Sequence, residues 1–536
     1  MKPQAKLFVR PSVFLLATAI VIAALPLAAA EPAAASVSSS IPKPVFAYDP
    51  ARREAGGIVA FDGTTPSQVI TRDGRQGLNF TSIRGRAGLP QHTAASARGT
   101  AAFWVLPLQD CAPATQLPAH GKSNSFYDRI VFLSDREAVQ EIEAANFCFL
   151  FDTGWYPALM AKFGHGTMHQ AAFGPNRIGM ASAGYLPLHA LHWYHLAVTW
   201  DHETHVYVLY VNGVKVGHSD TMEWPTPPSN DQPAPWLYFG SPTYAMGDIS
   251  FYDQALTGPQ LRELFQAQAK SKDREFQPEL EKMFEGRGLP PFDWKPDASW
   301  HKSLALPLKT DADYEHFFQQ GSGPSVRFIG EGMRITTPGF DEYYKRMGQS
   351  RTGGQMDMTR MYLWTRQVWQ GDLYVTVEFQ LHQHGGLALL MAQAAGMQGE
   401  DFLNDYPLRS DGSMSVVHRE DVRNYHWEFY REMADCRNDL VTHGCFKNPW
   451  LRPMAFQVEN RHWELGRWYR LEFLQQGPRI RGAIDGVTVI DAMDTGFDNN
   501  GPVLRHGRVA LRAMMRTDMT FRDLEIWTHP DFVAAP

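Results

Sequence analysis

Two copies of one strand-and-turn pattern constrain the fold of this chain more than any other feature. The first copy runs through residues 193–201 and 206–216, where apolar and polar residues alternate on both sides of Asn212-Gly213. Such alternation is typical of half-buried strands, and Asn-Gly supplies the positive φ angles that a tight hairpin requires. The second copy has residues 468–473 and then Asp485-Gly486 at nearly equal spacing. The repeat predicts two β-sandwiches in tandem, although convergence on common hairpin residues would produce the same pattern.

The length of the chain agrees with two domains, because 536 residues are too many for one ordinary core. Short strands broken by Gly, Pro and Asn turns fill residues 45–267, which end in one helix over 258–267 opened by Thr257. Residues 268–300 are charged and then proline-punctuated, which indicates a linker that is helical from 277 to 284. We therefore expect an all-β protein, with two tandem jelly-roll sandwiches at 45–267 and 301–530 joined by a partly helical linker.

The N-terminus has the pattern of a secretory signal. Lys2, Lys6 and Arg10 precede an apolar segment at 13–27 and three alanines, so residues 1–30 are predicted to be a signal peptide. Residues 31–44 are rich in Ala, Ser and Pro and are predicted to be a flexible leader. We expect a secreted or periplasmic protein with no stable membrane anchor after cleavage. An uncleaved anchor is the alternative, but the apolar run is short for a membrane span.

Cysteine content and charge limit the classes of protein. The four cysteines fall as Cys111 and Cys148 in the first half and Cys436 and Cys445 in the second, so one disulfide per half is the simplest pairing after export. Neither pair shows a full set of zinc ligands. The net charge of −7 disfavours nonspecific nucleic-acid binding.

Polar residues gather at three places in the second half. An apolar strand at 385–396 ends in a turn that carries Gln398, Glu400 and Asp401, which is either a salt-bridged corner or a ligand site. Alternation places one set of polar side chains, Glu378, Gln380 and His382, on one face of their strand. The same parity places His426, Glu428 and Tyr430 opposite the core residues Trp427 and Phe429. We interpret these rows as one concave trough for a ligand; a solvated outer face is the alternative.

Two family resemblances support this interpretation. Residues 193–252 resemble the laminin-G-like, concanavalin-A-like jelly roll, with its Trp-His strand, Tyr-x-Asn-Gly hairpin and Gly-x-Ile strand. Most of residues 300–530 is similar to the YesU-like family of bacterial jelly-roll proteins. The motifs that carry this similarity are Leu363-Trp364, Glu378-Phe379, residues 394–401, the His426 strand with Arg431, and residues 501–504. The resemblance implies a concanavalin-A-like fold and a role in plant or algal polysaccharide use, with Glu400, Asp401, His426 and Arg431 on motif positions.

Two reactions fit these residue types. In β-elimination of a uronate-containing glycan, Arg431 or Gln380 would offset the substrate carboxylate, and His426 and Tyr430 would serve as base and acid. Hydrolysis instead needs two carboxylates about 5 Å apart for retention or up to about 9 Å apart for inversion. The candidate carboxylates for hydrolysis are Glu378, Glu400, Asp401 and Glu428.

The sequence thus predicts a secreted protein that degrades a uronate-containing or pectin-like polysaccharide as a lyase or glycoside hydrolase. A non-catalytic glycan-binding protein and an adhesion module are the alternatives. The predicted catalytic residues are His426, Tyr430, Arg431, Glu400 and Asp401. The predicted substrate-binding residues are Glu378, Gln380, His382, Gln398 and Glu428. No cofactor is expected, but oxygen ligands at Asp491, Asp494, Asp498, Asn499 and Asn500 could hold calcium.

Overall fold

The computed structural model of the chain separates residues 1–40 from a compact unit of residues 41–536. It describes residues 41–51, 59–60, 67–80, 87–90, 96–109, 129–135, 147–152, 158–163, 179–184, 186, 188–204, 206–219, 236–321, 323–338, 359–407, 421–432, 440–449, 452–460, 463–496, 501–514 and 516–529. The predicted signal peptide lies outside these residues and stays a prediction. No helix in the described ranges is long and apolar enough to cross a membrane.

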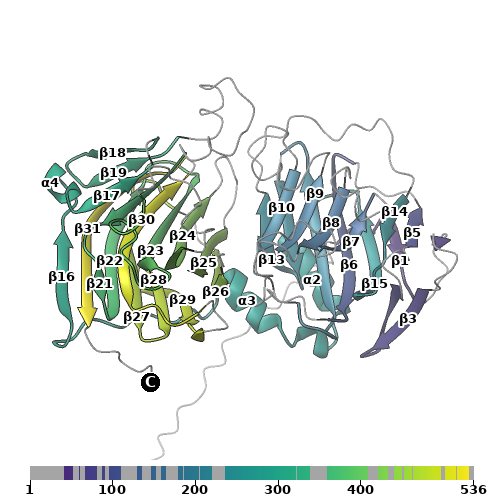
Figure 1. Ribbon diagram of the computed structural model, residues 1–536. Helices are drawn as coiled ribbons and strands as arrows, with labels where there is room; N and C mark the ends of the chain where they lie inside the picture. The colour runs from purple at the N-terminus through teal and green to yellow at the C-terminus, as the bar shows by residue number, and fades with distance from the viewer. Residues whose placement is uncertain are drawn as a thin grey trace, which may run out of the picture. The chain divides into compact units, whose positions relative to one another are not determined.

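The first half of the described chain is a sandwich of antiparallel strands (Figure 1). Its strands are β1 (Phe46–Tyr48), β2 (Val59–Ala60), β3 (Ser67–Arg72), β4 (Arg75–Phe80), β5 (Ala87–Pro90), β6 (Arg98–Pro107), β7 (Arg129–Ser134), β8 (Phe147–Asp152), β9 (Ala158–Phe163), β10 (Gly179–Gly184), β11 (Tyr194–Asp201), β12 (Val206–Val211), β13 (Val214–Ser219), β14 (Trp236–Phe239) and β15 (Tyr244–Tyr252). They pair in the order β2-β5-β14-β7-β8-β9-β10-β13-β12-β11-β6-β15-β4-β3, with β1 beside β15.

Side-chain alternation along β11 explains how this sandwich is held together. Leu196 and Trp200 point into the main core, while His195 lies on the other face, buried beside Trp104 with ring centroids 5.2 Å apart. The turn from β12 to β13 has φ of 51° at Asn212 and 73° at Gly213. This geometry confirms the predicted hairpin.

Helices follow the first sandwich where the sequence predicts them. Helix α2 (Gly258–Gln268) begins at Thr257, whose side chain accepts a hydrogen bond from the backbone N–H of Gln260. The other helical segments are η3 (Lys272–Arg274), α3 (Gln277–Glu285) and α4 (Asp311–Tyr314). Leu280 and Phe284 of α3 join the core of the first sandwich. The predicted linker helix is therefore present, whereas the exact domain limits stay predictions.

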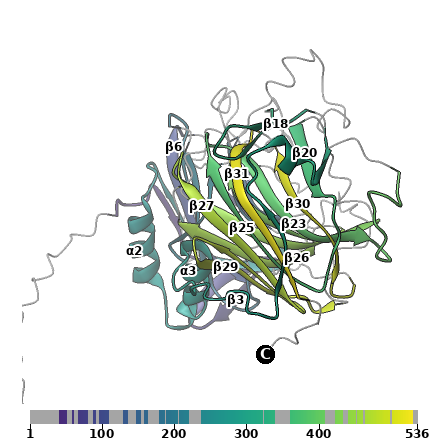
Figure 2. The ribbon, with the colours of Figure 1, turned by 90° about the vertical axis from the view of Figure 1, so that its left-hand side faces the viewer.

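The second half forms two further sheets (Figures 1 and 2). Its strands are β16 (His301–Leu306), β17 (Phe317–Gln320), β18 (Ser325–Phe328), β19 (Met333–Thr336), β20 (Arg360–Thr365), β21 (Trp369–Gln370), β22 (Asp372–Leu381), β23 (Gly386–Gly396), β24 (Val422–Glu432), β25 (Leu440–Asn448), β26 (Arg452–Asn460), β27 (Trp468–Gln476), β28 (Arg479–Ile484), β29 (Val487–Met493), β30 (His506–Met514) and β31 (Asp518–His529). Sheet I has the order β18-β19-β31-β22-β27-β28-β29, with β16 on β31. Sheet II has the order β17-β20-β30-β23-β24-β25-β26, with β21 on β30. The last two strands, β30 and β31, thus lie one in each sheet.

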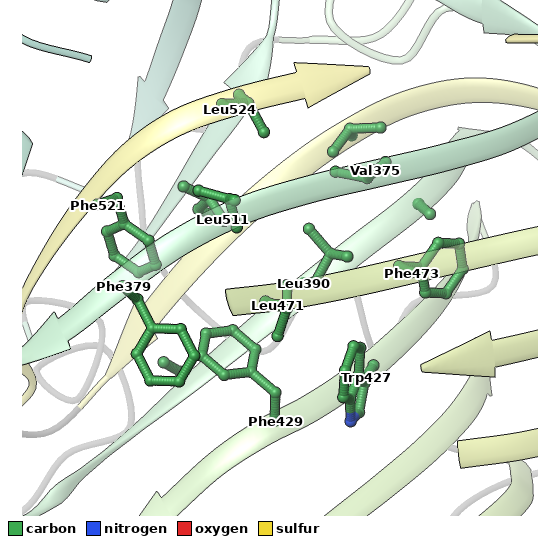
Figure 3. Close-up of a cluster of buried hydrophobic side chains, with 14 of the residues drawn as sticks. Val375, Phe379, Leu390, Trp427, Phe429, Leu471, Phe473, Leu511, Phe521 and Leu524 are labelled. Atoms are coloured by element: carbon green, nitrogen blue, oxygen red, sulfur yellow. The ribbon is translucent and has the colours of Figure 1, made fainter. Parts of the chain in front are cut away.

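Sheets I and II pack against each other through one apolar core. In Figure 3, Phe379 of sheet I lies against Phe429 of sheet II, and the ring centroids are 5.1 Å apart. Trp427 of sheet II packs over Gly482 of sheet I, where a Cβ atom would lie only 3.0 Å from the indole. The fold class predicted from the sequence, all-β with jelly-roll sandwiches, is confirmed. Because the two sheets share this core, their outer faces point to opposite sides of the sandwich.

Candidate functional site

A polar cluster lies on the outer face of sheet II. His426 and Glu428 project from β24, and Arg512 projects from β30. The register brings Arg512 and Glu428 into one row, because both are paired with Leu389 of β23 between them. Arg431 joins them from the same strand as Glu428. We call His426, Glu428, Arg431 and Arg512 the arginine–glutamate cluster.

Glu428 is the centre of the cluster. One carboxylate oxygen, Oε1, lies 3.5 Å from His426 Nε2, and the other, Oε2, lies 3.5 Å from Arg431 Nη1. The His426 and Glu428 side chains expose only 1% and 7% of their surface, whereas the Arg431 side chain exposes 42%. A ligand that approaches from solvent would therefore meet Arg431 first and the glutamate behind it.

The charges of the cluster set the protonation states. Burial lowers the pKa of His426, and the positive charge of Arg512 lowers it further, although Glu428 opposes both effects. Burial alone would raise the pKa of Glu428, but the adjacent His426 imidazole and the positive charges of Arg431 and Arg512 outweigh it and lower that pKa. Near neutral pH the pair is therefore a neutral imidazole beside an ionised carboxylate.

A β-bulge explains why Arg431 reaches this face and Tyr430 does not. Glu428 pairs with Leu389 and Tyr430 pairs with the adjacent Ala388, so Phe429 is an extra residue in β24. Tyr430 turns into the core, where its hydroxyl accepts a hydrogen bond from the backbone N–H of Gly385. The prediction that Tyr430 shares a face with His426 is therefore wrong, because strict alternation does not continue through the bulge.

An aromatic wall borders the cluster, and sequence reasoning did not identify it as part of the site. Tyr362 and Trp364 of β20 stack with ring centroids 5.3 Å apart, and the Arg512 guanidinium lies 4.4 Å from the Tyr362 ring centroid. Such a placement stabilises the buried cation through the aromatic face. The sequence signal that could have identified Arg512 is the alternation along β30, which places Arg508, Ala510 and Arg512 on one face of the strand.

The predicted substrate-binding residues Glu378, Gln380 and His382 lie elsewhere. They are on or directly after β22, on the outer face of sheet I, because Val377, Phe379 and Leu381 fill the shared core. Each of the three forms a hydrogen bond within the protein. Glu378 accepts from Arg522 Nε at 2.7 Å, and Gln380 donates to the Gly466 carbonyl at 2.6 Å. His382 Nε2 lies 2.6 Å from Thr520 Oγ1. The prediction of a single trough is wrong, because these residues and His426 lie on opposite sides of the sandwich.

The turn that carries Gln398, Glu400 and Asp401 is a hydrogen-bonded corner. Glu400 accepts hydrogen bonds from the backbone N–H of Gln398 at 2.9 Å and from Tyr406 Oη at 3.1 Å. The Arg508 guanidinium donates to both carboxylate oxygens of Asp401, from Nε to Oδ1 at 2.8 Å and from Nη2 to Oδ2. Phe402 then packs edge-on against Trp364, so the turn lies on the same side of the sandwich as His426. The structure thus favours the corner interpretation over the catalytic one for Glu400 and Asp401.

The candidate calcium ligands are only partly described. Asp491 forms a two-point ion pair with Arg479, and Asp494 is bound by Lys447, while residues 498–500 lie outside the described residues. The described part of the chain contains no group of three His, Cys, Asp or Glu side chains arranged to hold a metal ion. The calcium site stays a prediction.

The predicted disulfides involve Cys111 and Cys436, which also lie outside the described residues. Cys445, the expected partner of Cys436, is a free thiol in the core between the sheets, where burial raises its pKa to about 12. No disulfide is seen in the described part of the second half.

Both halves of the chain resemble known sequence families. Residues 326–526 match a family described as "Domain of unknown function (DUF1961)", and residues 166–262 match the "Concanavalin A-like lectin/glucanases superfamily". The uncharacterized protein YesU of Bacillus subtilis (strain 168) is 22% identical over 172 residues, which cover 32% of this chain and 78% of that protein. These matches confirm the two resemblances inferred from the sequence.

Solved structures overlap with the chain only loosely. A Bacillus subtilis protein of unknown function with a galectin-like fold has 18% sequence identity and a TM-score of 0.36, covering 44% of this chain and 100% of that one. A non-specific endo-beta-1,3(4)-glucanase has 13% identity and a TM-score of 0.32, covering 47% of this chain and 98% of that one. Overlaps of this quality carry no argument about function.

Proposed function

We propose that the second sandwich binds a uronate-containing glycan at the arginine–glutamate cluster of sheet II. The observation that carries this proposal is the position of Arg431, whose guanidinium lies 3.5 Å from the Glu428 carboxylate while its side chain stays 42% exposed to solvent. An exposed guanidinium attracts a carboxylate and binds it through two parallel hydrogen bonds. The match of the first half to a lectin and glucanase superfamily supports a carbohydrate as the ligand.

The reaction that we propose is β-elimination. Arg431, the exposed member of the cluster, would bind the uronate carboxylate and make the proton on the adjacent carbon more acidic. The His426–Glu428 pair would accept that proton, the bond from the next carbon to the glycosidic oxygen would break, and the freed electron pair would form a carbon–carbon double bond. The departing oxygen would take its proton from water, because Tyr430 faces the core and cannot supply it.

Hydrolysis is less well supported. It needs two carboxylates on opposite sides of the scissile bond. Glu428 is the one carboxylate of the arginine–glutamate cluster, while Glu400 and Asp401 on the same side of the sandwich are bound by Tyr406 and Arg508. A second candidate function is glycan binding without turnover, which the almost complete burial of His426 favours.

Affinity electrophoresis of the intact protein through gels containing polygalacturonate tests the binding proposal. We expect retardation by polygalacturonate and none by the same polymer after full methyl esterification, because esterification removes the carboxylate. Equal mobility in both gels would contradict the proposal.

Ultraviolet absorbance of the unsaturated product tests the reaction. Absorbance that rises with wild-type protein and not with Glu428→Gln supports elimination. Retardation without absorbance and without new reducing ends supports binding alone, and new reducing ends without absorbance support hydrolysis.

We also propose that the protein acts outside the cytoplasm, as the N-terminal sequence predicts. N-terminal sequencing of the exported protein tests this proposal, and we expect the mature chain to begin near Glu31. Recovery of the complete chain in the membrane fraction would instead support the uncleaved anchor.

A further inference from the structure

Two buried asparagines lie on the other side of His426 from Glu428. Asn424 is on β24 and Asn448 is on β25, and the sheet register pairs them directly. Asn448 Nδ2 donates a hydrogen bond to Asn424 Oδ1 at 2.8 Å, and the same amide nitrogen lies 3.3 Å from His426 Nδ1. Both asparagines expose none of their surface.

The direction of these hydrogen bonds determines which nitrogen of His426 carries the proton. An amide NH2 group only donates, so the nitrogen that faces it must offer a lone pair. His426 Nδ1 is therefore the acceptor, and in a neutral imidazole the proton then lies on Nε2. This nitrogen faces Glu428 Oε1 at 3.5 Å. The imidazole thus presents an N–H group to the glutamate.

We propose that Asn448 is a positioning residue that holds His426 in the Nε2–H form and thereby makes Glu428 the proton acceptor of the pair. This inference rests on the proposed function for its catalytic meaning. In the Nε2–H form the imidazole has no lone pair facing the outer side of sheet II, whereas the carboxylate keeps lone pairs toward the ligand. The base is then Glu428, and the Nε2–H group of His426, 3.5 Å from Oε1, stabilises its carboxylate electrostatically.

The surroundings of His426 keep this arrangement in place. The Phe446 ring of β25 packs at a centroid distance of 5.4 Å from the imidazole, and Arg512 of β30 adds a positive charge that disfavours a second proton. Because the asparagines are buried, water does not compete for their amide groups. The two amides therefore act as a rigid support for one tautomer.

Nitrogen NMR of uniformly 15N-labelled full-length protein tests the inference without any glycan, because the chemical shifts of Nδ1 and Nε2 differ between tautomers. We assign the His426 signals as those missing from His426→Gln. In the wild type we expect the signal of the protonated nitrogen at Nε2. In Asn448→Asp we expect it to move to Nδ1, since a carboxylate accepts from Nδ1–H and leaves a lone pair on Nε2.

Two controls keep the test decisive. Asn448→Ala should give a mixture of tautomers if Asn448→Asp does not fold. His443, which is on the same strand as Asn448 and packs beside Trp427, should keep its NMR signals in every variant. A wild-type proton on Nδ1, or an unchanged tautomer in both Asn448 variants, would overturn the inference. Absence of glycan binding and turnover with the expected tautomers would overturn the proposed function alone.

Discussion

Lys447 Nζ lies 2.7 Å from Asp494 Oδ2, and neither side chain exposes any surface. The ammonium also donates to the backbone carbonyls of Gly501 and Pro502, and Tyr425 donates its hydroxyl proton to the same Asp494 oxygen at 2.6 Å. Every proton of the ammonium therefore has an acceptor. This network joins strand β25 to the chain on both sides of residues 497–500.

Replacement of Lys447 by Met should destabilise the second sandwich strongly. The change leaves the Asp494 carboxylate buried without its cation, which typically costs about 3–5 kcal/mol. Urea unfolding measured by tryptophan fluorescence would give the loss. Arg479→Met is the matched control, because Arg479 and Asp491 form a partly exposed ion pair near the same turn and such pairs contribute about 1 kcal/mol or less. Equal losses of unfolding free energy in the two variants would show that the buried Lys447–Asp494 pair stabilises the fold no more than the partly exposed Arg479–Asp491 pair.

Replacement of Arg431 by Met should weaken binding of polygalacturonate about ten- to a hundredfold, the range expected for one lost hydrogen bond to a charged group. Isothermal titration calorimetry with oligogalacturonates would measure it. Arg522→Met is the control on the outer face of sheet I, where Arg522 pairs with Glu378 and covers Trp468 at 3.8 Å. If Arg522→Met weakened binding and Arg431→Met did not, the ligand face would be sheet I.

Replacement of Tyr430 by Phe should affect stability without affecting glycan affinity. In the core, the hydroxyl accepts from the backbone N–H of Gly385 and donates to the Gly385 carbonyl, and its loss leaves a buried N–H group unsatisfied at a cost of about 1–2 kcal/mol. Thermal unfolding and calorimetric titration of the same variant would separate the two effects. A folded Tyr430→Phe protein with impaired binding would show that the phenol reaches the ligand.

His195 should make the first sandwich sensitive to acid. Burial, reinforced by the positive charge of Arg75, lowers the pKa of His195 to about 3. Between about pH 6.5 and that value, the unfolded chain binds a proton at His195 that the folded chain does not, so stability falls as pH falls. The expected slope from this group is about 1.4 kcal/mol per pH unit.

The variant His195→Phe should remove that slope and retain the ring packing against Trp104. Urea unfolding at several pH values from about 7 down to about 4 would measure the difference from the wild type. His301→Phe is the control, because His301 is exposed on β16. Parallel pH dependences of wild type and His195→Phe would mean that His195 takes up its proton at the same pH in the folded and unfolded states, and would contradict the lowered pKa.

Local chemistry made much of the fold predictable. Asp485 and Gly486 adopt φ of 50° and 75° in the turn between β28 and β29, as Asn212 and Gly213 do in the first sandwich, so both hairpins lie where their turn residues predicted them. Helix α2 likewise begins at the residue whose side chain can cap it. These features depend on a few neighbouring residues, which the sequence displays directly.

The site was harder to predict because it depends on which strands become neighbours. Alternation correctly placed Glu378 and Phe379 on opposite faces of β22, but it could not show that β22 and β24 belong to different sheets. Arg512 lies about 80 residues from Glu428 in sequence and meets it only because β30 pairs with β23. The bulge at Phe429 also has no distinctive turn residue, so nothing in the sequence marked the change of face.

That bulge gives the protein an unusual genetic tolerance. Deleting the single codon for Phe429 would restore regular alternation in β24, yet the phenol of Tyr430 would still turn inward and the guanidinium of Arg431 would still turn outward, because both residues would keep their present strand partners. One in-frame deletion would thus remove a buried ring and leave every polar residue of the cluster on its face. Comparisons of related genes should therefore not take a strand shorter by one residue here as loss of the site.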